Sequence, residues 1–294
     1  MANPAPKTRS AATRALAPAE FLKELAAELA TGDVRLPSFP DVAQRVQRVL
    51  EDPRATPAPV AQVIGIDAAL AARILRLSNS AFLNPSGKPI TELQQALNRL
   101  GHQLVRCTAV SFAAQQMKVG EGDLVLRPQL HELWRKGTLV ASIAYVLARE
   151  TKAANPDEAL VAGLMHNIGS LYIAVRAYQH GGALGTDDAA TVLLNKGHPR
   201  IAAAILGHWK FAPTIVSAVG NQNASDRAVA GTDRLNDVLF AAVALVPCVY
   251  RALLGDTITA APPFERLGLH AADCKRLLTA TAQQIKSLHT ALAG

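Results

Sequence analysis

Residues 162 to 169 read Ala-Gly-Leu-Met-His-Asn-Ile-Gly, which places an imidazole, His166, directly beside a carboxamide, Asn167. An aspartate at the second position would bring a negative charge and a hard oxygen to a divalent cation. Asparagine brings only a neutral carbonyl dipole. The stretch is therefore built like part of a metal-dependent enzyme, but it lacks the charge that would hold the metal.

Around this stretch, apolar residues recur at intervals of three and four, which is the spacing of one face of a helix. The groups are Leu22, Leu25 and Leu29; Val42, Val46 and Val49; Leu70, Ile74 and Leu77; Leu93, Leu97 and Leu100; Leu139, Ile143 and Val146; Ile201 and Ile205; and Ile215 and Val219. No stretch alternates with the period of two that a strand would show. The sequence predicts an all-α fold.

Residues that favour helix ends support this prediction. They are the candidate N-caps Asp41, Asp67 and Thr91, the candidate C-terminal glycine Gly101, and the candidate first-turn prolines Pro156, Pro199 and Pro213.

Two polar, glycine-containing stretches, residues 118–123 and 223–232, interrupt the helical pattern. They divide the chain into a disordered tail (1–17), two helical subdomains (18–118 and 124–225) and a group of C-terminal helices (232–294). The tail faintly resembles a transit peptide, but a disordered Pro- and Ala-rich segment is the interpretation adopted. The last group ends in an apolar stripe that packs on its own domain or, alternatively, forms a homodimer: Leu278, Ile285, Leu288 and Leu292.

With 294 residues and a hydrophobic fraction of 50%, the chain is large enough to bury a sizeable core. No run of about 18 uninterrupted apolar residues occurs. The longest candidate, Val238–Tyr250, is short and contains Pro247. We expect a soluble protein without a membrane span. Its three widely spaced cysteines favour reduced thiols and a cytoplasmic location.

The net charge of +7 includes three positive charges in the tail, at Lys7, Arg9 and Arg14, which leaves +4 for the rest. Only 4% of the residues are aromatic, and no Lys/Arg cluster interleaves with them. Neither a stacking platform nor a stripe that tracks phosphates is visible. Nucleic-acid binding is therefore a minor alternative.

Several motifs occur in register along the chain. They are Leu36 to Pro40, Val63 to Leu70, Leu75 to Phe82, Ile90 to Gly101, Leu133 to Arg135, Ala162 to Gly169, His198-Pro199 and Ala204 to Trp209. In this order they resemble the HDOD family, the non-catalytic bacterial signalling relatives of HD-type and HD-GYP metal phosphohydrolases. The resemblance covers residues 36 to about 225. One departure is Ala68, where the family usually has proline.

The resemblance implies an N-terminal helical subdomain packed on a degenerate HD-like helical subdomain. Three residues of the N-terminal subdomain belong to the family signature: Asp67, Asn79 and Ser80. From the residues alone, Asp67 can cap a helix, and Asn79 and Ser80 can satisfy backbone groups at a helix end. We interpret them as structural, and a binding role is the alternative.

The resemblance also locates the ligands that an HD-type enzyme would use. Lys136 stands where the first histidine belongs, and a cation there would repel a metal. His166 matches the motif histidine, Asn167 replaces its aspartate, and His198 matches a further ligand. Asn221 and Gln222 stand where paired histidines are usual, and the distal aspartate falls near Val246-Pro247.

Two imidazoles without a carboxylate predict no metal, no cofactor and no catalytic residue. We interpret His166 as a buried histidine hydrogen-bonded to the backbone or to a neighbouring amide such as Asn167. His198, directly before Pro199, is interpreted as a residue that caps a helix start.

The leading hypothesis is a non-enzymatic signalling protein of the HDOD class, a pseudoenzyme that acts on a regulatory protein partner. The resemblance implies links to cyclic-di-GMP, motility or stress control. The alternative is a sensor of a nucleotide second messenger or another phosphorylated ligand, held in the vestigial cleft by Arg135, Lys136 and Lys196. A residual phosphohydrolase is the third reading.

Overall fold

A computed structural model describes Glu24, Ala27 and residues 45–46, 48–50, 56–81, 83–116, 123–179, 197–224, 234–251 and 261–293. The predicted tail, most of both polar interruptions, Asp41 and Lys196 lie outside these residues. The domain boundaries stay a prediction.

The described residues form helices and no strand, so the predicted all-α fold is confirmed. The helices are α3 (Pro57–Gly65), α4 (Ala68–Ser78), α5 (Leu93–Gln116), α6 (Asp123–Thr151), α7 (Pro156–Met165), α8 (Ile168–Gln179), α10 (His198–His208), α11 (Pro213–Gly220), α12 (Leu235–Arg251), α14 (Pro262–Arg266), α15 (Ala271–Ala280) and α16 (Ala282–Ala293).

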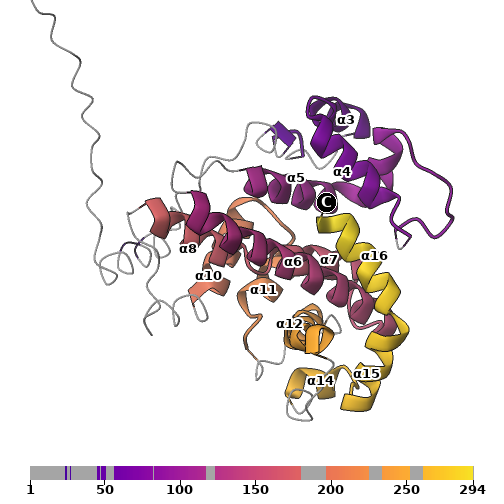
Figure 1. Ribbon diagram of the computed structural model, residues 1–294, viewed down its shortest axis with the longest axis vertical. Coiled ribbons are helices and arrows are strands. Elements are labelled where there is room, and N and C mark those ends of the chain that lie inside the picture. Colours follow the sequence, from indigo (N-terminus) through magenta and orange to yellow (C-terminus); the bar gives the residue numbers. More distant parts are fainter. Residues whose placement is uncertain are drawn as a thin grey trace, which may run out of the picture.

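Helix α6 is the central element, and it packs against α7, α12 and α16. In Figure 1, α3, α4 and α5 lie at one end of the molecule, and α12, α14 and α15 lie at the other. Helix α16 runs along α6 and returns to the first group, where it contacts α4. The last described helix therefore joins both ends of the fold.

The helix ends follow the sequence signals at most positions. Asp67 caps α4, because its Oδ1 accepts hydrogen bonds from the backbone nitrogens of Ala69 and Leu70, both at 3.0 Å. Gly101 has φ +71° and breaks α5 into two helical pieces. Thr91 was a wrong choice of N-cap, since α5 begins at Leu93 and Glu92 directly precedes it.

The C-terminal stripe packs on its own chain. Ile285, Leu288 and Leu292 are at most 5% exposed and belong to the common hydrophobic core. All three cysteines are unpaired and buried. Among the described residues, Pro156–Ala177 is the one helical stretch long and apolar enough to cross a membrane, but 89% of it is buried inside the fold, as in the central helix of a globular core.

A buried arginine holds α16 against the first helical group. Arg73, on α4, is 4% exposed, and its Nη2 donates to the carbonyl oxygen of Leu292 in the last turn of α16. Its guanidinium also lies 5.2 Å from the ring centroid of Trp134 on α6. One side chain therefore connects its own helix, α4, to two helices that are distant in sequence, α6 and α16.

Candidate functional site

The His166-Asn167 pair lies at the junction between α7 and α8, where His166 is the C-cap of α7. The imidazole is 2% exposed, and its Nδ1 lies 2.7 Å from the carbonyl oxygen of Gly163. Because a carbonyl oxygen only accepts, Nδ1 carries the proton and Nε2 carries the lone pair. Metal-binding histidines are oriented in the same way. The ring orientation is thus compatible with a ligand, and the question is what surrounds it.

Charge around the imidazoles disfavours any further cation. Burial lowers the pKa of His166 to about 3. Repulsion by the ammonium of Lys136, and by His198 when that ring is protonated, lowers it further, while the hydrogen bond to Gly163 opposes the effect. Burial and Lys136 lower the pKa of His198 to about 4. Both rings are therefore neutral near pH 7, beside an exposed lysine in the position of a first ligand.

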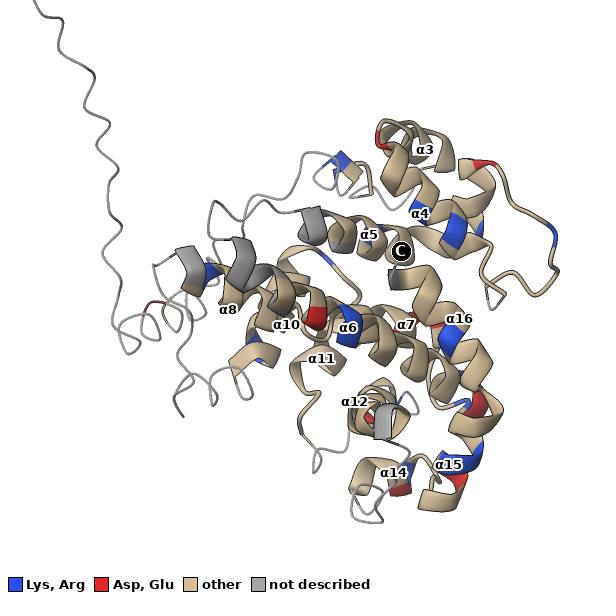
Figure 2. Ribbon diagram, viewed as in Figure 1, with Lys and Arg blue, Asp and Glu red and all other residues tan. Residues whose placement is uncertain are grey.

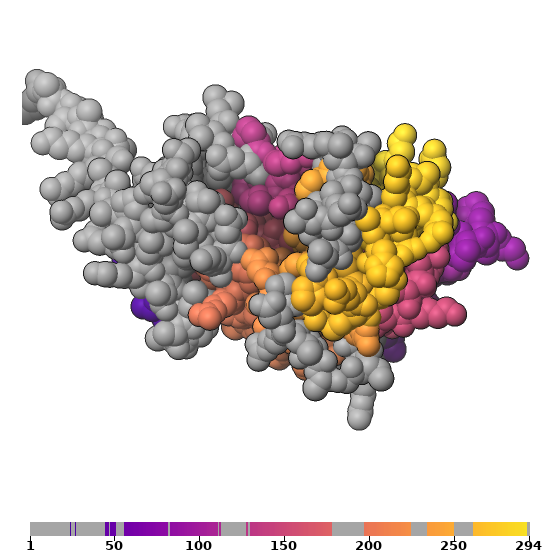
Figure 3. All heavy atoms as spheres, turned by 90° about the horizontal axis from the view of Figure 1, so that it is seen from below, coloured from indigo at the N-terminus to yellow at the C-terminus, as the bar shows by residue number. Residues whose placement is uncertain are grey.

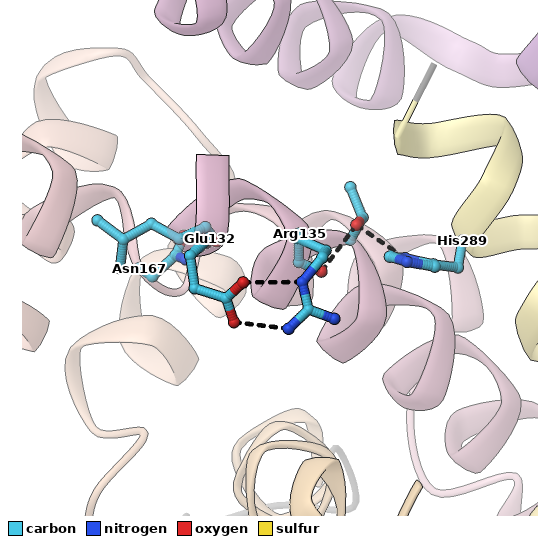
Figure 4. Close-up of polar contacts among 6 residues, drawn as sticks. Glu132, Arg135, Asn167 and His289 are labelled. Atoms are coloured by element: carbon cyan, nitrogen blue, oxygen red, sulfur yellow. Dashed lines mark hydrogen bonds and ion pairs between the residues drawn. The ribbon is translucent and has the colours of Figure 1, made fainter. Parts of the chain in front are cut away.

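Asn167 contacts α6 in a way that an aspartate could not. Its Nδ2 donates a hydrogen bond to the carbonyl oxygen of Leu133, and Figure 4 shows the side chain approaching α6. A carboxylate has only acceptor atoms and would meet this carbonyl without a proton between them. The amide lies directly against α6, since a Cβ at Gly137 would be in van der Waals contact with Asn167 Oδ1, at 3.4 Å.

Gln222 joins the same site from the end of α11. Its Nε2 donates to the carbonyl oxygen of His166 at 2.7 Å and to that of Val219 at 2.9 Å, and the residue is 2% exposed. Asn221 is the C-cap of α11 and donates to the carbonyl oxygen of Ser217 at 2.8 Å in its own helix. Two carboxamides, Asn167 and Gln222, therefore link three elements through backbone carbonyls.

His198 does not act as the helix cap that the sequence suggested. It is the first residue of α10, Gly197 is the N-cap, and no side chain caps this end. Its Nδ1 is buried and has no hydrogen-bond partner in the described part of the chain. The cap hypothesis was wrong because the helix begins one residue earlier than Pro199 implied.

Of the three basic residues of the phosphate hypothesis, the two that the structure describes, Arg135 and Lys136, do not converge. Lys136 lies near both histidines, as its effect on their pKa values shows. Arg135 points elsewhere and pairs with Glu132, with Nη2 to Oε1 at 2.6 Å (Figure 4). Lys196 lies outside the described residues. Of the two described residues, Lys136 is the one placed to contact a ligand beside His166.

The donor atoms at this junction do not fit a catalytic metal. Within the described ranges, no three His, Cys, Asp or Glu side chains come together as a metal site would require. The groups that do come together are two imidazoles, two carboxamides that donate to carbonyls, and a lysine. Divalent magnesium or manganese prefers carboxylate oxygens.

The signature residues of the N-terminal subdomain all contact backbone. Asn79 is the C-cap of α4, and its Nδ2 donates to the carbonyl oxygens of Leu75 at 2.9 Å and Ile90 at 2.7 Å. Its Oδ1 accepts from the nitrogen of Ile90 at 2.8 Å. The Ser80 hydroxyl accepts from the nitrogen of Leu83 at 3.4 Å. Asn79 thus ties a loop of eleven residues to the end of α4.

Two glycines of the motif, which sequence reasoning passed over, allow close helix packing. A Cβ at Gly163 would lie 2.4 Å from the Cα of Ala141, where α7 crosses α6. A Cβ at Gly169 would lie 2.0 Å from the carbonyl oxygen of His198, where α8 meets α10. Both distances are too short for any side chain. The two glycines therefore allow the helices to pack closely at the junction. Their position next to His166-Asn167 was the sequence signal that could have predicted this close packing.

The helical fold and the His166-Asn167 junction together define the class of protein, an all-helical protein of the HDOD type. A sequence profile of the HDOD domain matches residues 36–225, so the chain belongs to the HDOD domain family, which is related to HD phosphohydrolases.

Solved structures share this fold. One is a protein of Shewanella amazonensis provisionally named a metal-dependent phosphohydrolase, which is 27% identical, with a TM-score of 0.71 over 94% of this chain and 99% of that one. An HDOD domain protein of unknown function from Geobacter sulfurreducens is 23% identical, with a TM-score of 0.58 over 93% and 98% of the two chains. A Marinobacter aquaeolei protein provisionally named for signal transduction is 18% identical, with a TM-score of 0.56 over 96% and 68%.

One curated relative, an uncharacterized protein of Treponema pallidum, is 24% identical over 279 residues, which are 90% of this chain. The chain spans about half the length of this relative, 52%.

Proposed function

We propose that this chain is a non-enzymatic bacterial signal-transduction protein that acts in the cytoplasm through contact with a regulatory protein. The observation that carries the proposal is the hydrogen bond from the Asn167 amide to the Leu133 carbonyl. It gives the motif's second residue a structural role that requires an amide, at the position where a hydrolase requires a carboxylate.

The Gln222 amide supports the same conclusion. It binds the carbonyl oxygen of His166 and so connects α11 to the α7–α8 junction. Hydrogen bonds through Asn167 and Gln222 join elements that a hydrolase would join through a metal ion. A protein built in this way needs no cation to hold the junction, and its output is a surface or a conformation rather than a reaction.

The names of the similar proteins refer to both signalling and hydrolysis, and they name no partner. The name of the Marinobacter protein refers to signal transduction, and the HDOD resemblance implies circuits of cyclic-di-GMP turnover, motility or stress control. The name of the Shewanella protein refers to a phosphohydrolase. That name fits common ancestry with HD enzymes, but the junction of this chain lacks the carboxylate on which such chemistry depends.

A second candidate is a sensor that binds a nucleotide or another phosphorylated molecule at the vestigial junction without cleaving it. Lys136 is exposed beside His166 and His198, and His198 Nδ1 has no described partner. A phosphate oxygen could accept from the ammonium of Lys136. Protein contact is preferred because Arg135 is directed to Glu132 and does not add a second cation at this place.

The proposal is tested by turnover and metal content of the purified full chain. We expect no hydrolysis of bis(p-nitrophenyl) phosphate or cyclic-di-GMP with manganese, iron or magnesium, and less than stoichiometric metal after purification without chelator. The matched comparison is the double variant K136H/N167D, which restores two ligand types. Turnover by the unaltered chain that rises with metal content, and that His166→Gln abolishes, would overturn the proposal.

The partner arm uses the full chain as bait in the host, with calorimetry against a panel of nucleotides in parallel. We expect a specific protein to be captured and no heat from any nucleotide. Heat that Lys136→Ala removes would replace protein contact by the sensor hypothesis.

A further inference from the structure

A pocket of about 570 Å³ lies on the other side of α6 from Asn167, between α6, α12, α15 and α16. This volume is within the range of small-molecule sites. Gly137 of α6 faces Asn167, whereas Arg135 and Leu139, each two positions away from Gly137, line the pocket. Two positions along a helix are about 200° apart around its axis. Figure 4 shows Asn167 and His289 on either side of Arg135. The pocket is therefore separate from the vestigial junction, and no property of His166 enters the argument.

The walls of the pocket are largely aliphatic. Leu139 comes from α6, Val249 from α12, and Leu278 and Ile285 from α15 and α16. Val249 is 42% exposed, one of two large hydrophobic side chains this exposed among the described residues. Exposed aliphatic surface inside a concave site gains free energy when an apolar ligand covers it. In Figure 3, α15 and α16 form a broad part of one face of the molecule.

The polar groups of the pocket are cationic or neutral. Arg135, Lys275, Lys286 and His289 contribute to the lining, and none of the lining residues that the structure describes is acidic. Figure 2 shows basic residues on α15 and α16. Of the neighbouring acids, Asp273 pairs with Arg276, and Glu132 pairs with the lining residue Arg135. Lys275 and Lys286 form no ion pair with any described carboxylate.

His289 fixes one wall. Its Nδ1 lies 2.8 Å from the Thr138 hydroxyl, and that hydroxyl donates to the carbonyl oxygen of Arg135 at 3.0 Å. Since the single hydroxyl proton is used in this bond, the hydroxyl accepts from Nδ1. The imidazole is thereby held against α6 with its ring as a flat side of the pocket.

This combination selects among ligand classes. A nucleotide base gains affinity by stacking on aromatic rings, and no Phe, Tyr or Trp is among the described lining residues. A bare inorganic anion would leave the aliphatic walls uncovered. An aliphatic chain that ends in an anion satisfies both the walls and the lysines.

We propose that this pocket binds a monomeric long-chain carboxylate, with its alkyl chain along Leu139, Val249 and Ile285 and its carboxylate at Lys275 and Lys286. The pocket is formed partly by α16, which also contacts α4. A ligand that fills it alters the packing of the helix that joins both ends of the fold. The site thus offers an input to the protein that is chemically distinct from a phosphorylated messenger.

The test is calorimetry of the full chain with octanoate, decanoate and dodecanoate, each below its micelle concentration. We expect affinity to rise roughly two- to fourfold per methylene group, as expected for burial of an alkyl chain. Two controls each lack one part of the ligand: dodecanol has no carboxylate, and inorganic phosphate has no alkyl chain. Each should bind at least about tenfold more weakly than dodecanoate.

Variants separate this pocket from other surfaces. K275A/K286A removes two exposed lysines at the rim, and we expect affinity for dodecanoate to fall about tenfold with an unchanged melting temperature. The charge-matched control R76A/K88A, on exposed residues of the first helical group, should bind as the unaltered chain does. Val249→Glu places an anion inside the wall and should abolish binding.

Three outcomes would overturn the proposal: no binding of any carboxylate, affinity independent of chain length, or affinity equally reduced by both double variants. Anionic phospholipid vesicles form the last arm. Binding to vesicles without binding to monomeric dodecanoate would assign the lysines to a lipid surface and reject the pocket.

Discussion

The two sides of one short segment of α6, residues 133–138, differ in burial and in the volume left open to solvent. On one side, the Asn167 amide reaches the Leu133 carbonyl, and His166 and Gln222 are nearly fully buried. On the other side, Arg135 and His289 border an accessible pocket with aliphatic walls. The side that the sequence motif marks is closed by hydrogen bonds, whereas the side without a motif has space for a ligand. The residues of the HD-like motif and the open pocket therefore lie on opposite sides of one helix.

The largest expected effect is a loss of stability when the helix packing around the His166-Asn167 junction is disrupted. Gly169→Ala would place a Cβ 2.0 Å from the carbonyl oxygen of His198, which forces α8 and α10 apart. We expect the free energy of unfolding to fall by more than about 3 kcal/mol. Urea denaturation measures it. The control is Gly207→Ala in α10, where nothing lies within 4 Å of the new Cβ and a helical alanine should be neutral or stabilising. Equal effects of the two would refute the packing argument.

The second-largest expected effect is a fall in the free energy of unfolding at acid pH, caused by protonation of His166 and His198. The folded pKa values of about 3 for His166 and about 4 for His198 lie below the ordinary 6.5, so the unfolded chain binds more protons. This stability is complete above pH 6.5 and is lost as pH falls toward 4. Between pH 6.5 and 5 we expect a loss of roughly 2 to 3 kcal/mol. Denaturation at several pH values measures the slope, and His166→Gln should reduce it by about half. A slope that this variant leaves unchanged would contradict the assignment.

Asn167→Asp tests the hydrogen bond that carries the proposed function. A carboxylate cannot donate to the Leu133 carbonyl, so we expect a loss of about 2 kcal/mol in unfolding free energy. Manganese should not recover it. Thr138→Val removes the contact with His289 on the pocket side of α6 and should lower the free energy of unfolding by less, about 1 kcal/mol. Thermal denaturation with and without manganese compares the two variants, and full recovery by the metal would show that a cation site had been restored.

The smallest effect is expected at the rim of the pocket. Glu132→Gln removes an exposed ion pair with Arg135, which should change the free energy of unfolding by less than about 1 kcal/mol. The same change leaves one more net positive charge beside the pocket, and dodecanoate should bind about twofold more tightly. A large loss of stability in this variant would contradict the claim that the rim of the pocket contributes less to folding than the buried junction.

Much of the helical frame could be predicted, because helix signals are local. Asp67 caps α4 through atoms two and three residues away, and Gly101 breaks α5 at the positive φ that glycine tolerates. The buried state of His166 and its backbone partner also followed from the motif. The partner is the Gly163 carbonyl, whereas Asn167, which was the example offered, is directed to α6.

The contacts that shape the site could not be predicted, because they join distant segments. The Asn167 to Leu133 bond spans 34 positions, and the Gln222 to His166 bond spans 56. Asn79 was interpreted as satisfying its own helix end, but it also pairs with Ile90 across a loop. The pocket draws its lining from four helices without a shared motif. The apolar periodicity of a single helix gives no information about a cavity that four helices enclose together.

The bond between Arg73 and the Leu292 carbonyl has a consequence for biosynthesis. The two residues are 219 positions apart. At a translation rate of about 5 to 20 residues per second, Arg73 precedes its acceptor by roughly 10 to 45 seconds. During this interval the guanidinium has no α16 to contact, and the nascent first helices stay without that cover. A ribosome that stalls before codon 292 therefore leaves the buried guanidinium of Arg73 without its acceptor in α16.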